Sequence, residues 1–314
     1  MDIRNLGRSG LRVSLVGLGC NNFGGRIDLE ASRKVVHKAL DLGITLLDTA
    51  DTYGNFGGSE ECLGAILGAR RKDVVLATKF GLPMNAEGTI KGASRRYVMS
   101  EVEASLRRLK TDWIDLYQLH QPDPLTPIEE TLRALDDLVR QGKVRYIGCS
   151  NLPAWQVVEA QWTARHLGLN AFVCAQDEYS LVVRGIDREL IPALQAYDMG
   201  LLPFFPLASG LLTGKYRRNA TLPAGTRLAN TQRLADRFLT EANWQIAERL
   251  QDFAATRGHS LLELAFSWLV ARPQVASVIA GATKPEQLEE NVKAAGWALS
   301  AADTTEIDRI TKAA

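Results

Sequence analysis

Short apolar segments alternate with longer amphipathic segments along almost the whole chain. Eight of the apolar segments have the length and the aliphatic composition of buried β-strands. In chain order they are Leu15–Gly19, Ile44–Asp48, Val74–Lys79, Trp113–His120, Val144–Cys149, Phe172–Gln176, Leu201–Phe205 and Ala276–Ala280.

Each of these strands is followed by at least one segment with helical spacing of its apolar residues. The predicted helices are Leu29–Leu42, Ser59–Leu67, Ser94–Leu109, Pro127–Arg140, Pro153–His166, Asp187–Tyr197, Asn243–Thr256, Leu261–Val270, Pro285–Ala294 and Ala301–Ile310. Ser94 is typical of an N-cap, and Pro127 and Pro285 suit a first helical turn. The last third of the chain contains more helices than strands, so additional helices are expected there.

Two segments lie outside this alternation. Ile3–Val13 consists of two short extended pieces around a Gly-rich turn, which predicts an N-terminal β-hairpin. Leu211–Asp236 is long, polar and rich in Gly, Arg, Thr and Asn. A loop of that length within a compact domain is usually functional or disordered.

Eight strand–helix units predict an α/β fold of the parallel (β/α)8 TIM-barrel type. No change in composition marks a boundary, so we expect residues 1–314 to form a single domain. An open dinucleotide-binding sheet is the alternative, and it requires a Gly-x-Gly-x-x-Gly motif. Gly17-Leu-Gly19 is instead followed by Cys20-Asn-Asn22, so that motif is absent.

The composition argues against a nucleic-acid-binding or a membrane-spanning protein. The chain is 46% hydrophobic and 23% charged, which is typical of a soluble globular protein. Its 37 Lys and Arg nearly balance 36 Asp and Glu, so no nucleic-acid partner is indicated. No apolar run reaches the ~18 residues of a membrane span. No signal peptide is evident, and a cytoplasmic location is expected.

The four cysteines are scattered and form no Cys-x-x-Cys pair. They are Cys20, Cys62, Cys149 and Cys174. This spacing predicts free thiols of a reducing compartment, with neither a disulfide framework nor a metal site.

Four residues with acid–base chemistry stand at or just beyond the ends of the second, third and fourth predicted strands. They are Asp48, Tyr53, Lys79 and His120. Because all strands of a parallel barrel end at one rim, these side chains should lie together. Individually each would also fit a cap, a packing residue or a surface charge. A phenol beside an ammonium can act as a proton donor, so the set predicts a proton-transfer site.

The chain has no Gly-x-Ser-x-Gly, His-Glu-x-x-His or P-loop motif, so no covalent nucleophile is evident. The site therefore needs a second reactant that carries electrons, for which a dinucleotide is suitable. Ser150, Asn151 and Gln176 follow the fifth and sixth strands and suit a carboxamide such as that of nicotinamide. Phe204 offers a flat face to a ring.

A phosphate site is predicted towards the C-terminus. The helix Pro285–Ala294 should present free N–H groups at its N-terminus, next to Lys284. Lys215 and Arg227 in the long polar segment could reach a pyrophosphate. Plain surface charge is the alternative interpretation of these cations.

With these motifs in place, the chain resembles the aldo-keto reductases over essentially its full length. It is most similar to their bacterial and potassium-channel-β-like branch. The resemblance is carried by six segments in the same order: Asp48-Thr-Ala-Asp-Thr-Tyr-Gly54, Thr78-Lys79, Leu116-Tyr-Gln-Leu-His120, Gly142-Lys-Val-Arg-Tyr-Ile-Gly-Cys-Ser-Asn151, Pro206-Leu-Ala-Ser-Gly-Leu-Leu-Thr-Gly-Lys-Tyr216 and Gly281-Ala-Thr-Lys-Pro-Glu-Gln-Leu-Glu-Glu-Asn291.

The resemblance implies a nicotinamide cofactor stretched across the C-terminal rim and reversible hydride transfer between it and a small carbonyl substrate. It places the family's catalytic tetrad on Asp48, Tyr53, Lys79 and His120. Tyr53 would be the general acid, Lys79 paired with Asp48 would lower its pKa, and His120 would orient the carbonyl. The cofactor residues implied are Cys20, Asn21, Asp48, Ser150, Asn151, Gln176, Phe204, Phe205, Pro206, Leu207, Ser209, Lys215, Arg227, Gly281, Thr283, Lys284, Gln287, Glu290 and Asn291.

NADP(H) is expected over NAD(H), although the chain departs from the better known branch. That branch has a basic and a hydroxyl residue in place of Gly281-Ala282, and an arginine in place of Gln287. Two other functions remain open: a redox-sensing regulatory subunit that binds NADPH, and a barrel hydrolase or lyase using Asp48 and Lys79. An oligomer is possible but not indicated. Four rim loops should set the substrate: Phe23–Asp28, Phe80–Ala93, Gln121–Pro127 and Leu211–Asp236.

Overall fold

Eight parallel strands curl into a barrel in the computed structural model, which describes residues 1–312. The strands are β3 (Val16–Gly19), β4 (Leu46–Asp48), β5 (Val75–Phe80), β6 (Ile114–Leu119), β7 (Val144–Ser150), β8 (Cys174–Gln176), β9 (Gly200–Leu201) and β10 (Val278–Gly281). Their order is β10-β3-β4-β5-β6-β7-β8-β9. Backbone hydrogen bonds close the remaining gap, from Leu201 N–H to the Gln274 carbonyl (2.7 Å) and from Ile279 N–H to the Pro203 carbonyl (3.0 Å). The predicted (β/α)8 barrel is therefore confirmed.

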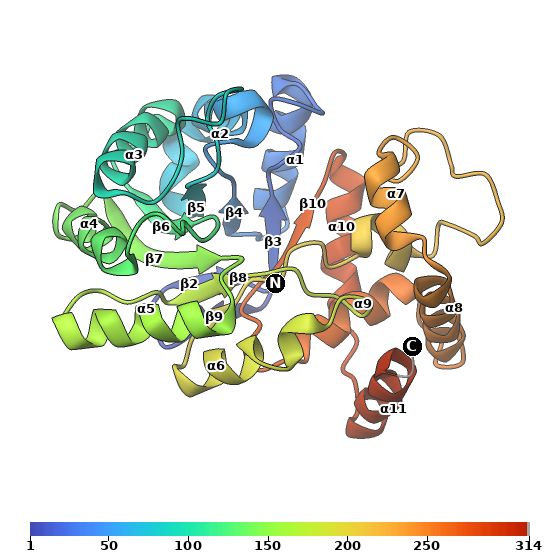
Figure 1. Cartoon of the computed structure of the whole chain (residues 1–314). Helices are drawn as coiled ribbons and strands as arrows, with labels where there is room; N and C mark the ends of the chain where they lie inside the picture. The colour runs from blue at the N-terminus through green and yellow to red at the C-terminus, as the bar shows by residue number, and fades with distance from the viewer. Residues whose placement is uncertain (313–314) are drawn as a thin grey trace.

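The helices lie outside the strands (Figure 1). They are α1 (Leu29–Asp41), α2 (Tyr53–Leu67), α3 (Arg95–Leu109), α4 (Ile128–Arg140), α5 (Ala154–Leu167), α6 (Leu190–Ala196), α7 (Gln232–Phe238), α8 (Glu241–Ala255), α9 (Leu261–Val270), α10 (Pro285–Ala294) and α11 (Ala301–Lys312). The Ser94 side chain caps α3 by accepting from Tyr97 N–H at 3.4 Å, and Pro285 opens α10, as predicted. Helices α8 and α11 are among the additional helices expected in the last third of the chain, whereas α7 was not predicted.

The seventh strand and the long polar segment differ from their predicted forms. β9 ends at Leu201, and beyond it Phe205, Ala208 and Ser209 have positive φ angles, so the backbone cannot stay extended. The chain turns instead into a 3-10 helix over Ala208–Thr213. The predicted loop, residues 211–236, therefore begins inside this 3-10 helix and ends inside α7. The expectation that the whole segment is a loop was wrong at both of its ends.

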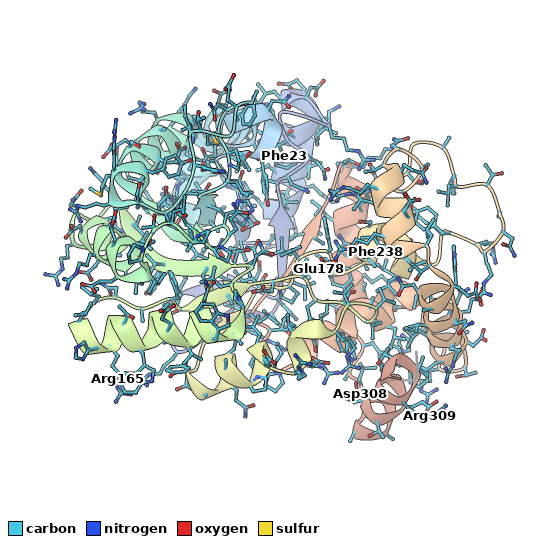
Figure 2. The ribbon with its side chains drawn as sticks, viewed as in Figure 1. Phe23, Arg165, Glu178, Phe238, Asp308 and Arg309 are labelled. Carbon is cyan, nitrogen blue, oxygen red and sulfur yellow. The ribbon has the colours of Figure 1, made fainter. Side chains whose placement is uncertain are left out.

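Helix α7 is tied to the barrel. Arg237 forms an ion pair with Glu178 at 2.6 Å, and the ring of Phe238 meets the ring of Phe205 edge-on at 6.4 Å between centroids. Figure 2 shows Glu178 on the barrel side of this contact and Phe238 on α7. The far end of the long segment is thus anchored beside the ends of β8 and β9.

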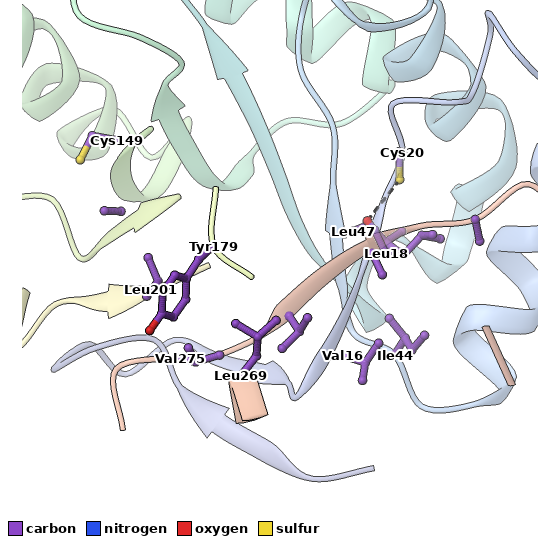
Figure 3. Close-up of a cluster of buried hydrophobic side chains, with 14 of the residues drawn as sticks. Val16, Leu18, Cys20, Ile44, Leu47, Cys149, Tyr179, Leu201, Leu269 and Val275 are labelled. Atoms are coloured by element: carbon purple, nitrogen blue, oxygen red, sulfur yellow. Dashed lines mark hydrogen bonds between the residues drawn. The ribbon is translucent and has the colours of Figure 1, made fainter. Parts of the chain in front are cut away.

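The side chains on the two faces of the strands form two separate hydrophobic clusters. Outward-facing residues pack under the helices, and Figure 3 shows Val16, Leu18, Ile44 and Leu47 in this layer. Cys20, just past β3, donates from its thiol to the Leu18 carbonyl at 3.6 Å. All four cysteines are buried and free, as predicted.

Inward-facing residues fill the barrel itself. Leu46, Ala77 and Leu116 form a cluster with Leu6 and Val13 of the N-terminal hairpin. That hairpin pairs β1 (Ile3–Asn5) with β2 (Arg12–Ser14), as expected, and it closes the N-terminal end of the barrel.

Strand periodicity then determines which side chains face the opposite end. Successive side chains in a strand alternate between faces, so the next inward residue lies two positions on. From Leu46, Ala77 and Leu116 this step leads to Asp48, Lys79 and Gln118. The apolar interior therefore gives way to polar groups at the C-terminal rim.

Candidate active site

An ion pair lies at the centre of this rim. The Lys79 ammonium is 2.7 Å from Asp48 Oδ2 and donates to the Thr49 carbonyl at 2.8 Å. Lys79 is fully buried and Asp48 is 3% exposed. Burial alone lowers the pKa of Lys79, but Asp48 and Tyr53 outweigh it, so the net pKa is raised. The site therefore holds a permanent cation at neutral pH.

Tyr53 lies against this cation. The Lys79 Nζ is 5.0 Å from the centroid of the Tyr53 ring. Burial raises the pKa of Tyr53, while the charge and a hydrogen bond of Lys79 lower it, and the net pKa stays above the ordinary value. Lys79 thus acts in the predicted direction, but it offsets only part of the effect of burial. The hydroxyl is protonated at neutral pH and available as a donor.

The turn that carries Tyr53 depends on Gly54. This residue has φ +71°, and a Cβ there would lie 2.5 Å from the Phe23 carbonyl oxygen and 2.6 Å from the Ser59 nitrogen. The backbone stays in the left-handed region through Gly57, so the regular part of α2 begins near the predicted Ser59. Only glycine fits this close approach without a shift of the backbone.

His120 faces the phenol from the end of β6. The rings of Tyr53 and His120 meet edge-on, 5.6 Å between centroids. Burial, and then the Lys79 charge, lower the pKa of His120 well below its usual value, so the imidazole is neutral at neutral pH. Its Nδ1 is buried and has no hydrogen-bond partner among residues 1–312. A neutral imidazole with unused hydrogen-bonding capacity can contact a ligand oxygen.

The sequence alone did not single out Gln118 as a residue of the site. Its side-chain amide donates to Asp48 Oδ1 at 3.3 Å, and Gln176 donates to the same oxygen at 2.8 Å. Both glutamines are buried. The spacing could have identified Gln118, since it precedes His120 by two residues and so shares its face of β6. Asp48 therefore has neutral donors on one oxygen and the Lys79 cation on the other.

The residues proposed for a carboxamide lie on the same rim. Ser150 donates to the Gln176 carbonyl at 2.7 Å. Asn151, with φ +60°, donates from its side chain to the His120 carbonyl at 3.0 Å. The ring of Phe204 meets that of Phe205 edge-on at 5.4 Å. The structure thus brings the ends of β6, β7, β8 and β9 together around the tetrad.

Comparison with known proteins identifies the family. A sequence profile described as the Aldo/keto reductase family matches residues 15–312. The chain belongs to the aldo/keto reductase family. The chain is an oxidoreductase, and the family generally uses NAD(P)H as its redox cofactor.

Curated relatives of this aldo/keto reductase have different names. It is 39% identical to a probable voltage-gated potassium channel subunit beta of Oryza sativa subsp. japonica, over 94% of this chain and 91% of that protein. It is 37% identical to L-glyceraldehyde 3-phosphate reductase of Escherichia coli K12, over 94% and 87%. It is also 37% identical to an uncharacterized oxidoreductase of Bacillus subtilis, over 94% and 91%.

Other residues expected at the cofactor follow neighbouring strands of the barrel. Phe205–Ser209 and Lys215 lie beyond the end of β9, and Lys284 lies between β10 and α10. Ser209 has φ +56°, and its hydroxyl oxygen is buried without a partner in the described part of the chain. Asn21 follows β3, and its side chain lies 3.2 Å from where a Cβ of Gly281 would be. An unpaired hydroxyl on an irregular backbone fits a polar ligand such as a diphosphate.

The start of α10 carries a side-chain cap. The side-chain oxygen of Gln287 accepts from the backbone N–H of Thr283 at 2.8 Å and of Lys284 at 3.3 Å. Both N–H groups precede Pro285, so they are satisfied before the first helical turn begins. Asn291 is 5% exposed, whereas Lys284 and Glu290 are exposed.

Within residues 1–312 no group of three or more His, Cys, Asp or Glu is arranged to hold a metal ion. The helices of the same range include none that is both long enough and apolar enough to cross a membrane.

Proposed function

We propose that this protein is a reversible carbonyl reductase, which reduces small aldehydes or ketones to alcohols with NADPH. The observation that carries the proposal is the buried Lys79–Asp48 pair, which lies beside Tyr53 and a neutral His120. These groups supply a proton donor, a fixed cation to stabilise its conjugate base, and a hydrogen-bonding group for a substrate oxygen.

The nicotinamide ring, when bound, supplies the hydride. Tyr53 gives its hydroxyl proton to the carbonyl oxygen during reduction and takes it back during oxidation. The Lys79 ammonium stabilises the phenolate that remains, and Asp48 keeps that ammonium charged and in place. His120 hydrogen-bonds the carbonyl oxygen and turns it towards Tyr53. A neutral imidazole suits this role, since a second cation would compete with Lys79 for the phenolate.

The nicotinamide end would be held by Ser150, Asn151 and Gln176, with Phe204 against the ring. The preference for NADPH is supported by Lys284, which stands at the start of α10. A 2′-phosphate beside an exposed lysine would gain a charge-assisted hydrogen bond. One relative is named a reductase of a small phosphorylated aldehyde, so short aldehydes are suitable first substrates.

A regulatory subunit that binds NADPH with little turnover is the second candidate. It is favoured by the names of two plant relatives, from Oryza sativa and Arabidopsis thaliana, which are 39% and 37% identical to this chain. The presence of all four acid–base residues at one rim favours turnover instead.

Steady-state reduction of nitrobenzaldehyde and glyceraldehyde with NADPH tests the proposal. Tyr53→Phe keeps the ring and removes the transferable proton, so kcat should fall by at least ~100-fold, the usual effect of a lost general acid. The Kd for NADPH should change little. Tyr197→Phe, at the end of α6, is the matched control. Tyr53→Phe with most of the activity of the wild type would refute the proton-donor role, and a wild type without turnover that still binds NADPH would favour the regulatory subunit.

A further inference from the structure

A second group of buried polar side chains lies behind the turn that carries Tyr53. Asp51, two residues before Tyr53, is fully buried. Its Oδ1 accepts from the Thr52 N–H at 2.7 Å, and its Oδ2 accepts from the Tyr97 hydroxyl at 3.3 Å. Its own backbone N–H donates to the Lys79 carbonyl at 3.1 Å. Asp51 thus connects the turn of Tyr53 both to β5 and to α3.

Glu60 is a second fully buried carboxyl group in the same region. It lies in the regular part of α2, and its Oε1 accepts from the Thr78 hydroxyl at 2.5 Å. Thr78 precedes Lys79 in β5 and faces the helices, because successive side chains of a strand alternate between faces. Arg108 of α3 donates to Glu60 at 2.6 Å and also pairs with Glu101. The strand of Lys79 is therefore also connected to α3.

Helix α3 supports both connections with one of its faces. Tyr97, Glu101 and Arg108 are separated by four and seven residues, which places them on the same side of a helix. Gly57, at the end of the left-handed stretch after Tyr53, packs against this face. A Cβ there, where φ is +120°, would lie 2.6 Å from Arg108 Cδ. The turn of Tyr53 and β5 therefore rest on the same helix.

The cost of burying these polar groups argues for more than a packing role. Apolar side chains would hold α3 on the barrel without removing carboxyl groups from water. Hydrogen bonds, in contrast to apolar contacts, fix both direction and distance. Burial, then Glu101 and Glu60, raise the pKa of Asp51 well above its ordinary value, which favours the neutral acid. The ionisable side chains that face Asp51 are Tyr53 of its own turn, Glu60 of α2, Tyr97, Glu101 and Arg108 of α3, and Tyr117 of β6.

We propose that Asp51 is a positioning residue of the reaction, which holds the turn of Tyr53 at its distance from the Lys79 ammonium. This inference rests on the proposed carbonyl reductase function. Asp51 acts through the Thr52 N–H on one side and through α3 on the other. The distance matters because the attraction between an ammonium and a phenolate weakens as they separate. Catalytic geometry must be kept within about 0.5 Å.

Two variants of Asp51 separate its hydrogen bonds from its charge. Asp51→Asn keeps an oxygen for the Thr52 N–H and a polar group for the Tyr97 hydroxyl, whereas Asp51→Ala keeps neither. In Asp51→Ala the turn should move away from Lys79, so that the pKa of Tyr53 rises. The pH optimum for alcohol oxidation should then move up, and kcat should fall by at least ~10-fold, since a shift of ~1 Å can cost about 100-fold. Asp51→Asn should keep kcat within about twofold of the wild type and keep its pH profile.

A negative charge on Asp51 would act in the opposite direction. It would raise the pKa of Tyr53, so its removal in Asp51→Ala and in Asp51→Asn would move the optimum for oxidation down. That result would overturn the positioning role. So would Asp51→Ala with the kcat and the pH profile of the wild type.

Tyr97→Phe is a milder test, because it removes only the hydroxyl that donates to Asp51 and keeps the ring in place. It should move the pH optimum in the same direction as Asp51→Ala. The matched control is Asp136→Ala, which removes a buried carboxyl group of α4 that accepts from the Asn170 N–H at 2.9 Å and from its side chain at 2.7 Å. The control should lose folding stability and keep the pH profile. An unchanged optimum in both Tyr97→Phe and Asp51→Ala would leave the group a role in stability alone.

Crystal structures of the variants separate this inference from the proposed function. Lys79 Nζ lies 5.0 Å from the centroid of the Tyr53 ring, and this distance should be kept in Asp51→Asn. In Asp51→Ala it should grow by roughly 0.5 Å or more. That result in a protein without turnover of nitrobenzaldehyde or glyceraldehyde would leave the positioning role standing and remove the reductase function. An unchanged distance in Asp51→Ala would refute the positioning role.

Discussion

At the scale of single residues, the effect of Lys79 depends on where its charge is buried. The ammonium has no exposed surface, and its partners are one carboxylate oxygen, one carbonyl oxygen and the face of Tyr53. A charge in such surroundings is poorly screened and acts strongly on its neighbours. It shifts the pKa of Tyr53 and of His120 in the same direction, towards lower values, although the net shift of Tyr53 is upward because of burial.

Lys79→Met should therefore change the pH dependence of the reaction as well as its rate. Without the ammonium the pKa of Tyr53 rises further, so the phenolate needed for alcohol oxidation forms only at higher pH. The pH optimum for oxidation should move up, and kcat should fall. Asp48 would also be left buried without its cation, which costs about 3–5 kcal/mol of folding free energy.

The measurement is the pH profile of kcat for alcohol oxidation, together with chemical denaturation. Lys34→Met, which removes an exposed lysine of α1, is the control. An active Lys79→Met enzyme with the pH profile of the wild type would show that the lysine does not act on Tyr53.

At the scale of elements, the N-terminus of α10 shows how a cap can alter an anion site. A helix start with Pro285 in its first turn offers N–H groups and a favourable dipole. Here the Gln287 side chain occupies the Thr283 and Lys284 N–H groups. Those two groups cannot also bind a 2′-phosphate without displacing Gln287. The exposed Lys284 ammonium stays available, so we expect it to distinguish NADPH from NADH.

Lys284→Ala should then weaken NADPH binding by about tenfold, since one charge-assisted hydrogen bond is worth at least ~1.4 kcal/mol. NADH lacks the 2′-phosphate and should bind as before. The measurement is Kd for both cofactors by protein fluorescence at fixed salt. Lys293→Ala, in the last turn of the same helix, is the control. Equal losses for the two cofactors, or a wild type that already prefers NADH, would contradict the expected preference for NADPH.

At the scale of the whole molecule, the residues that stabilise the barrel and the residues that carry its chemistry lie at opposite ends. The hairpin side is filled with apolar residues, and the polar groups gather at the opposite rim. The hairpin fits tightly, since a Cβ on Gly7 would lie 2.6 Å from the backbone nitrogen of Gly200 in β9. Substitutions at the hairpin end should therefore affect folding far more than catalysis.

Leu6→Ala tests this separation. Leu6 is fully buried in the inner cluster, so the variant should lose about 2–5 kcal/mol of folding free energy through lost burial and a new cavity. KM and kcat for nitrobenzaldehyde should stay within about twofold at a temperature where the variant is folded. Leu125→Ala is the control, because Leu125 is 90% exposed and its loss should cost little. An unchanged midpoint of urea denaturation in Leu6→Ala would contradict the role of the hairpin as a plug.

The sequence by itself determined the eight strand–helix units, the hairpin and the gathering of Asp48, Lys79 and His120 at one rim. These follow from local periodicity, because a two-residue repeat fixes strand faces and parallel strands of a barrel end on the same side. The chain alone also pointed to the aldo/keto reductase family, which the profile match over residues 15–312 confirms.

Only the tertiary structure decided the quantities that depend on distant neighbours. The net rise in the pKa of Tyr53 reflects burial by the surrounding elements, which no local pattern encodes. The donation of Gln118 to Asp48, the capping by Gln287 and the early end of β9 are likewise results of packing. The hydrogen bond from Arg26 to the Gly225 carbonyl likewise exists only because the barrel brings two loops that are distant in the sequence to the same rim.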